Sequence, residues 1–256
     1  MIRTLPLLAA LALLPAAAQA ARIVNVQPAA SRGAADGLSG EISGQLNWST
    51  GNTEVTQISA GAGALYLHGP HRIYFAGRAA YGIDDGEAFV NNVFEHLRYR
   101  YRWTTAFGAE SFVQHEFDEF RRLQLRALWG VGPRFDVPVP QPFELAFGTA
   151  WMLEYERVSD DAETDAGAEQ LDQRWSSYLY LSATATPGIQ LTHTAYVQPR
   201  FDDFGDWRLL SESAAVLDVK KWLAVKIAFT LAYDSRPPAD VKKQDTAFGT
   251  SLLFRL

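Results

Sequence analysis

Four stretches of the chain carry charged side chains with an every-second-residue spacing, and these residues have the greatest capacity for chemistry. The charges are basic within 96–102, acidic within 110–118, basic within 122–134 and acidic within 144–156. Such a spacing places side chains on one face of an extended strand. The residues concerned are His96, Arg98, Arg100, Arg102, Glu110, Glu116, Asp118, Arg122, Arg126, Arg134, Glu144, Glu154 and Glu156.

Adjacent antiparallel strands with this pattern would place opposite charges face to face, which is favourable. Such an arrangement has two possible uses. It can be a structural lattice of ion pairs and hydrogen bonds that fills and stiffens an interior. It can also be a charged eyelet through which small polar solutes pass. Folding the stretches as hairpins predicts three pairs: Arg134 with Glu144, Arg126 with Glu154, and Arg122 with Glu156.

The histidines give no indication of catalysis. None of the five adjoins a serine in a recognisable nucleophile motif, and cysteine is absent. We therefore expect no enzyme activity, no catalytic residue and no cofactor. The histidines are His68, His71, His96, His115 and His193.

An acidic segment at 159–172 holds six carboxylates without the spacing of an EF-hand loop. We expect no intrinsic metal site here. The segment is either a solvated acidic loop or a surface that shares divalent cations with lipopolysaccharide phosphates. The formal net charge of −6 argues against nucleic acid as a partner, because phosphate binding needs a basic face.

The elements that must position the charges are β-strands. From Leu38 to Trp48 apolar and polar residues alternate strictly, and the alternation continues to the end of the chain. The pattern predicts about twelve strands of membrane-crossing length, with the facing of the second strand left open. The predicted spans are 38–49, 54–67, 72–83, 90–103, 106–118, 123–137, 143–157, 174–186, 189–201, 207–219, 222–233 and 247–256.

The connections between these strands alternate in character. One set is short, and the other tends to be longer and acidic, as in bacterial outer-membrane barrels. Tyrosine and tryptophan fall mostly at outward positions near strand ends, where membrane interfaces favour them. We therefore predict an all-β fold, a transmembrane antiparallel up-and-down β-barrel. The alternative is a soluble all-β protein such as a sandwich or a lipocalin-like barrel.

The start of the chain indicates export. Arg3 precedes an apolar stretch from Leu5, and Ala18-Gln19-Ala20 fits the pattern that signal peptidase reads. An uncleaved anchor is the alternative. The expected partners are outer-membrane lipid, lipopolysaccharide and the barrel assembly machinery. The predicted organisation is a signal peptide at 1–20, a flexible periplasmic lead-in at 21–36 and an outer-membrane β-barrel at 37–256.

Two segments carry a family resemblance. The turn Thr50-Gly51-Asn52-Thr53 and the closing hairpin from Tyr233 to Thr246 resemble the YdiY-like family of salt-induced or acid-inducible outer-membrane proteins. That family is a domain of unknown function. The resemblance implies a single-domain outer-membrane barrel, and the family label implies a role in the envelope under salt or acid stress. It implies no biochemical activity.

Barrel closure would pair the last strand with the first, because an open sheet edge cannot persist in lipid. The first turn and the last loop would then meet at the outer rim, as a small external site or as a clasp that seals the seam. At the level of the whole protein, a structural barrel competes with a narrow channel and with an adhesion module. The seam residues are Gly51, Asn52, Asp234, Lys242, Lys243 and Asp245.

Overall fold

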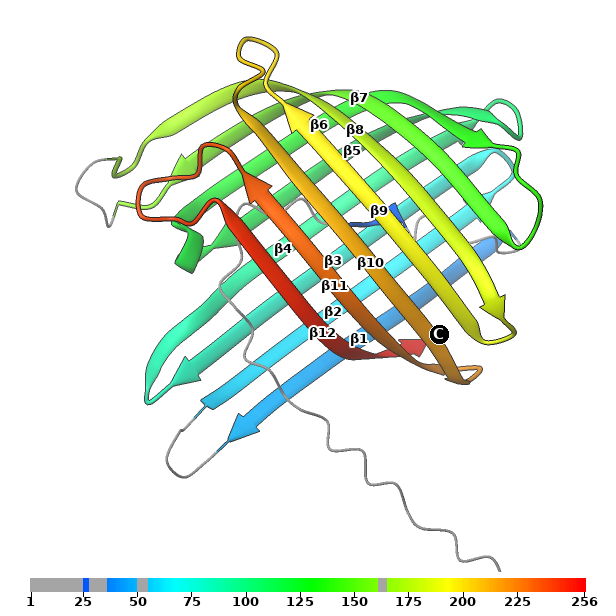
Figure 1. The fold of residues 1–256 in the computed structure, drawn as a ribbon, viewed down its shortest axis with the longest axis horizontal. Coiled ribbons are helices and arrows are strands. Elements are labelled where there is room, and N and C mark those ends of the chain that lie inside the picture. The colour runs from blue at the N-terminus through cyan, green and yellow to red at the C-terminus, as the bar shows by residue number, and fades with distance from the viewer. Residues whose placement is uncertain (1–24, 28–35, 50–54, 161–164) are drawn as a thin grey trace, which may run out of the picture.

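The computed structural model describes residues 25–27, 36–49, 55–160 and 165–256. Within these ranges the chain forms twelve antiparallel strands that close into one barrel (Figure 1). The strands are β1 (Gly37–Ser49), β2 (Val55–His68), β3 (His71–Asp84), β4 (Glu87–Arg102), β5 (Phe107–Asp118), β6 (Leu123–Val137), β7 (Phe143–Val158), β8 (Glu169–Thr186), β9 (Ile189–Pro199), β10 (Trp207–Lys220), β11 (Leu223–Asp234) and β12 (Gln244–Arg255).

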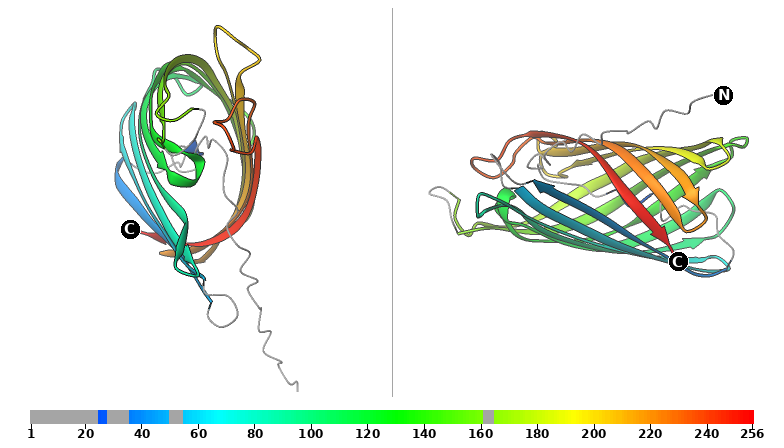
Figure 2. Two further views of the ribbon diagram at one scale, coloured as in Figure 1. Left: turned by 90° about the vertical axis from the view of Figure 1, so that its left-hand side faces the viewer. Right: turned by 90° about the horizontal axis from the view of Figure 1, so that it is seen from below.

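Each strand pairs with its neighbours in sequence, and β12 returns to β1. The predicted antiparallel up-and-down barrel is therefore confirmed. Figure 2 shows the ring of strands from one end and their tilt from below. One short 3-10 helix, Glu119–Arg121, lies between β5 and β6. No helix among the described residues is long and apolar enough to cross a membrane.

The barrel has two different ends. The "turn end" carries the start of β1, the end of β12 and the connections 69–70, 103–106, 138–142, 187–188 and 221–222. The "loop end" carries the other connections, including 159–168, 200–206 and 235–243. One predicted long connection is in fact a tight turn, because Asp85 and Gly86 both have positive φ and form a two-residue hairpin.

The alternation of residue types places apolar side chains outside and polar ones inside. In β4, His96, Arg98 and Arg100 are buried, whereas Leu97 and Tyr99 between them are exposed. A side-chain period of two therefore gives the barrel a charged interior and an apolar outer wall. The exposed outer wall includes the aromatic side chains of Tyr66, Tyr81, Trp103, Trp129, Trp175 and Trp222.

The largest boundary difference lies at the acidic segment. The sequence pattern begins a strand at Arg174, but β8 begins at Glu169, which pairs with Arg157 of β7. Cross-strand hydrogen bonding and the opposite charges at this position extend the hairpin through residues with weak strand propensity. The predicted 159–172 loop is therefore shorter, and Asp172 lies inside β8.

The seam that closes the barrel is brief. β1 and β12 pair from Glu41↔Arg255 to Gly44↔Leu252, and backbone hydrogen bonds link Gly40 with Leu256 at the turn end. By contrast, β1 pairs with β2 over its whole length. The strands that close the barrel therefore meet at the turn end alone, within the described residues.

β6 and β7 approach each other closely at Gly132. A Cβ built on Gly132 would collide with the carbonyl oxygen of Thr149 and lie 2.5 Å from the Cα of Ala150. Backbone atoms cannot move aside as a flexible side chain can, so glycine is required at this position. The next residue, Pro133, lacks an N–H and also weakens the local ladder.

We therefore expect Gly132→Ala to lower the free energy of unfolding by about 1–3 kcal/mol, the usual cost of overpacking. The control is Gly44→Ala on β1, where a new Cβ meets nothing within 4 Å. Urea unfolding of refolded protein in detergent, followed by tryptophan fluorescence, measures both variants. Equal midpoints for the two variants would contradict the close approach.

Candidate functional site: a charged lattice inside the barrel

The first group of interior charges surrounds one carboxylate near the turn end. Arg98 Nη1 and Arg100 Nε each donate to Glu110 at 2.6 Å, from β4 to β5. The Tyr178 hydroxyl donates to the same carboxylate at 2.8 Å and accepts from Arg134 Nη1 at 2.9 Å. All five side chains are buried. We call these residues the Glu110 cluster; its bonds join strands β4, β5, β6 and β8 across the lumen.

The second group surrounds a carboxylate near the loop end. Glu154, only 2% exposed, accepts from Arg174 Nε at 3.0 Å and from Arg208 Nη1 at 2.6 Å. Arg126 Nη2 donates to Glu156 at 2.6 Å, and Arg208 Nη2 donates to the same carboxylate at 3.1 Å. We call these five residues the Glu154 cluster. Because each arginine bridges carboxylates or strands, the cluster is a connected network rather than a set of separate pairs.

Further carboxylates complete the second cluster. Arg126 Nη1 lies 3.2 Å from Glu116, and Arg174 Nη1 donates to Asp206 at 3.0 Å. Arg208 Nε donates to Asp234 at 2.9 Å. Buried charges are tolerated only when they are paired and hydrogen-bonded. This network meets that requirement through strands β5, β6, β7, β8, β10 and β11.

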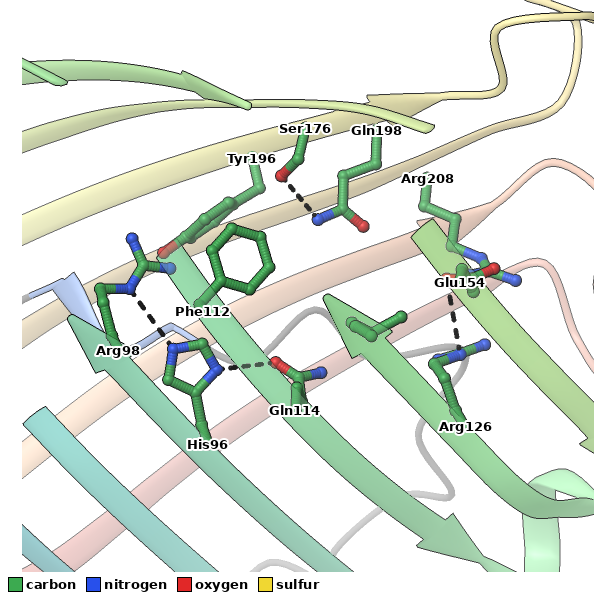
Figure 3. A pocket seen from close by; sticks show the side chains of 11 residues that line it. His96, Arg98, Phe112, Gln114, Arg126, Glu154, Ser176, Tyr196, Gln198 and Arg208 are labelled. Atoms are coloured by element: carbon green, nitrogen blue, oxygen red, sulfur yellow. Dashed lines mark hydrogen bonds and ion pairs between the residues drawn. The ribbon is translucent and has the colours of Figure 1, made fainter. Parts of the chain in front are cut away.

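The space between the two clusters is filled. Arg98 Nε donates to His96 Nε2 at 3.3 Å, and His96 Nδ1 lies 3.1 Å from Gln114 Oε1. The Arg98 guanidinium also stacks 4.9 Å from the centre of the Phe112 ring. The side chains shown in Figure 3 leave a cavity of about 20 Å³, room for about one water molecule.

The structure brings together most of the residues that the sequence pattern selected. Eight of them lie in the two clusters or contact them: Arg98, Arg100, Glu110, Glu116, Arg126, Arg134, Glu154 and Glu156. Arg102 is half-buried at the end of β4, and Glu144 is exposed near the turn end. Asp118 is buried beside Arg121, with which it forms an ion pair at 3.6 Å.

Two of the three predicted pairs are wrong, and the third is confirmed as a contact with a different register. Arg126 lies directly opposite Glu156, yet its Nε also lies 3.8 Å from the Glu154 carboxylate, as predicted. Arg134 lies opposite Gly148 rather than Glu144. The β6–β7 connection sets this register, and the hairpin count misplaced its turning point. Arg134 instead reaches Asp136 at 2.6 Å on its own strand.

Arg122 does not join the lattice. It has a φ of 55° in the connection between β5 and β6, which turns it out of the strand phase. Its Nη1 donates to Asp165 at 2.5 Å and to the carbonyl oxygen of Ala239 at 3.2 Å. Asp165 also accepts from the backbone N–H of Ala239 at 2.9 Å. We call these three residues the loop clasp, since they join three connections at the loop end.

The predicted seam site at the outer rim is not assembled from the residues that can be placed. Asp234 is fully buried against Arg208 and belongs to the lumen, because its strand phase points inward. Lys242 and Lys243 are exposed, Asp245 is half-buried, and Gly51 and Asn52 lie outside the described residues. The last loop instead contacts neighbouring connections: Ala239 belongs to the loop clasp, and Arg236 lies 2.7 Å from Asp203.

Sequence reasoning missed four important lumen residues. Arg174, Tyr178 and Arg208 share the inward phase of their strands, so the alternation that selected the other charges could have found them. No residue pattern around Gln27 indicates a position inside the barrel. This residue lies in the segment predicted to be a flexible periplasmic lead-in, yet Asn25, Val26 and Gln27 are buried inside the barrel.

The described residues contain no group of three or more His, Cys, Asp or Glu side chains that could hold a metal ion. Two of the carboxylates of the predicted acidic loop have other partners. Asp165 belongs to the loop clasp, and Asp172 lies 3.5–3.6 Å from Arg200 and Arg174.

Removing the central carboxylate of the Glu154 cluster should destabilise the barrel. Glu154→Gln keeps the shape of the side chain but removes the buried charge that Arg174 and Arg208 share, and it places amide donors against guanidinium donors. We expect a loss of about 3–5 kcal/mol, the usual cost of breaking a buried ion pair. Glu144→Gln makes the same chemical change on the same strand at an exposed position and serves as the control. Similar thermal midpoints for both variants would show that the network contributes little.

The loop clasp should respond to acid. The backbone N–H of Ala239, followed by Arg122, holds the pKa of Asp165 below its ordinary value. A lowered pKa stabilises the clasp above the unfolded-state pKa of about 3.9, and this contribution is lost as the pH falls through the lowered value. We therefore expect the clasp to stay closed at pH 5 and to open below about pH 4.

Cleavage by an acid-active protease between pH 5 and pH 2 measures this opening at the connections 159–168 and 235–243. Asp165→Asn should make these connections sensitive already at pH 5. Asp160→Asn is the control, because the exposed carboxylate of Asp160 makes, among the residues that the structure describes, a 3.8 Å ion pair with Arg157 and no contact with the loop clasp. Equal cleavage of both variants at pH 5 would rule out the clasp.

Comparison with known proteins supports the fold. The structure of the NanC porin aligns with a TM-score of 0.52 and 10% identity, covering 85% of this chain and all of that one. The translocator domain of the autotransporter NalP from Neisseria meningitidis aligns with a TM-score of 0.47 and 12% identity, covering 90% and 92%. Among curated proteins, none matches by sequence. The family model described as protein of unknown function DUF481 matches residues 41–256, and the chain belongs to that family.

Proposed function

We propose that this protein is an outer-membrane barrel closed through its lumen, with a structural role in the cell envelope. The filled interior is the observation that carries the proposal. Between the two charged clusters the side chains leave a cavity of about 20 Å³, and most of the side chains that line it are buried, which favours an interior without the continuous column of water that ions or polar solutes need. A dehydrated ion would also have to break buried ion pairs in order to pass.

The outer wall supports a location in the outer membrane. Leu46, Ile58 and Trp222 are 56–62% exposed, and many other large apolar side chains share their outward phase. A protein surrounded by water rarely exposes so much contiguous apolar surface. Lipid and lipopolysaccharide are the partners that this wall fits, and the barrel assembly machinery would insert it. No enzyme activity is part of the proposal.

The lattice also suits a role under salt or acid stress. Salt screens exposed charges over about 8–10 Å at physiological strength, whereas buried pairs are screened much less. The interior ion pairs would therefore keep their strength when the external salt concentration rises. At the loop end, the lowered pKa of Asp165 keeps the loop clasp charged in moderate acid.

A narrow channel for ions or small polar solutes is the second candidate. The wall of the lumen is lined with charged groups, and the groups that fill it, such as Gln27, are held by non-covalent contacts. A rearrangement of side chains could therefore open a charged path without breaking a covalent bond.

Conductance in a planar bilayer distinguishes the two candidates. We expect the refolded protein, prepared without the predicted signal peptide, to give no stepwise current between 0.1 and 1 M KCl. Heat-modifiable migration on a gel shows that the barrel is folded in the same preparation. A folded barrel with steady, charge-selective steps would overturn the closed barrel in favour of the channel.

The thermal midpoint of the same preparation tests the stress role. It should change little between 0.1 and 1 M KCl, because the stabilising ion pairs are buried. A steep fall in the midpoint with salt would contradict a role under salt stress.

A further inference from the structure

The turn-end part of the lumen has more positive than negative charge. Arg98, Arg100 and Arg134 share the carboxylate of Glu110, and Asp136 adds a second carboxylate beside Arg134. A third, Glu144, acts on Arg134 and Arg72 without an ion-pair contact. In addition, Arg72 of β3 lies directly opposite Arg100 of β4. Like charges at directly opposite positions of an antiparallel pair repel each other, and the repulsion increases away from water. This arrangement favours an additional anion.

A neutral side chain occupies the position where such an anion would bind. Gln27 Oε1 accepts from Arg134 Nη1 at 3.0 Å and from Arg100 Nη2 at 3.3 Å, and the residue is fully buried. One amide oxygen thus bridges two guanidinium groups. A carboxylate oxygen at the same position would make shorter, charge-assisted hydrogen bonds to both. Planar guanidinium groups are also suited to binding carboxylates through two parallel bonds.

The amide nitrogen of Gln27 is less well hydrogen-bonded than the amide oxygen. The Nε2 atom is buried and makes no hydrogen bond of good geometry among the described residues, although the Tyr196 hydroxyl lies close to the Gln27 side chain. An unsatisfied buried donor costs about 1–3 kcal/mol. A carboxylate has no donor and would not carry this cost.

The segment that carries Gln27 is held, among the described residues, by apolar packing and side-chain hydrogen bonds without an ion pair. Val26 packs against a small apolar group that includes Leu65, Tyr74 and Phe94, and Asn25 Nδ2 donates to Glu212 at 3.3 Å. Figures 1 and 2 show this short blue piece inside the ring of strands. Because the segment belongs to the same chain, its effective concentration at the arginines is high, and a free ligand must compete with it.

We propose that Arg100 and Arg134, with Arg98 and Arg72 beside them, form a binding site for a carboxylate-bearing solute, and that Gln27 occupies this site as an internal substitute. The solute class follows from the guanidinium pair, the excess positive charge and the burial. The inference goes beyond the closed structural barrel, since a solute can bind here whether or not the lumen conducts.

Citrate is the probe, with chloride at equal ionic strength as its reference, and the thermal midpoint of the refolded barrel is the readout. Gln27→Glu supplies the carboxylate internally, so we expect a midpoint above that of the unaltered protein and no response to citrate. Gln27→Ala vacates the site, so citrate should raise its midpoint in a saturable way. The unaltered protein should need at least tenfold more citrate for the same rise, because Gln27 competes.

Two controls separate this site from general effects. Gln190→Ala removes another lumen glutamine, which donates to Ser182 rather than binding the arginine pair, and the midpoint of this variant should not respond to citrate. The double variant Gln27→Ala/Arg134→Gln should lose the citrate response of Gln27→Ala. The proposal is overturned if Gln27→Glu lowers the midpoint, or if citrate acts equally on Gln27→Ala and Gln190→Ala. These measurements do not depend on conductance. The binding-site proposal can therefore fail while the closed barrel is supported, and the closed barrel can fail while the binding site is supported.

Discussion

The constraint on which the rest of this structure depends is the side-chain period of two in a closed sheet. A sheet that faces lipid must pair its backbone groups within itself, which closure achieves. Once the outer wall is apolar, every second residue must point into a confined interior. In this chain those residues include many charges, so the interior has to neutralise them. The arginine–carboxylate network is a direct consequence of that requirement.

The neutralisation is uneven along the barrel axis. The Glu154 cluster near the loop end surrounds its arginines with several carboxylates, whereas the Glu110 cluster near the turn end gives three arginines one shared carboxylate. The loop-end cluster holds more carboxylates than arginines, and the turn-end cluster holds more arginines than carboxylates, so the lumen has an internal electric field along the barrel axis. Any anion that enters from the turn end meets attraction first, and the carboxylates beyond it then oppose further passage.

The parts of the fold that follow from local pattern could be predicted from the sequence. Alternation places β6 at Leu123–Val137 without error, and it selects Arg98, Arg126 and Glu154 as interior residues. Features set by geometry at a connection could not be predicted. The register of β6 and β7 depends on where the chain turns between 138 and 142. The sequence pattern therefore predicts Glu144 opposite Arg134, whereas Gly148 occupies that position.

Other features depend on contacts that no local pattern encodes. Arg122 leaves the strand phase because of one left-handed backbone position, and it then binds two distant connections. Gln27 reaches the lumen from a stretch without alternation, and only the three-dimensional structure places it between Arg100 and Arg134. The candidate ligand site is therefore the least predictable part of the molecule.

The short seam has a consequence for how the barrel is made. Every other strand pair in the described sheet joins neighbours in sequence, so each can form as a hairpin with a small loop-closure entropy. β1 and β12 alone must find each other across nearly the whole chain, and they do so over four residue pairs. Long-range pairing is slow because its entropy is paid before its contacts form. The described sheet therefore leaves its one long-range pairing to a joint of four residue pairs, and formation of that joint is the step of barrel assembly that this topology predicts to be slowest.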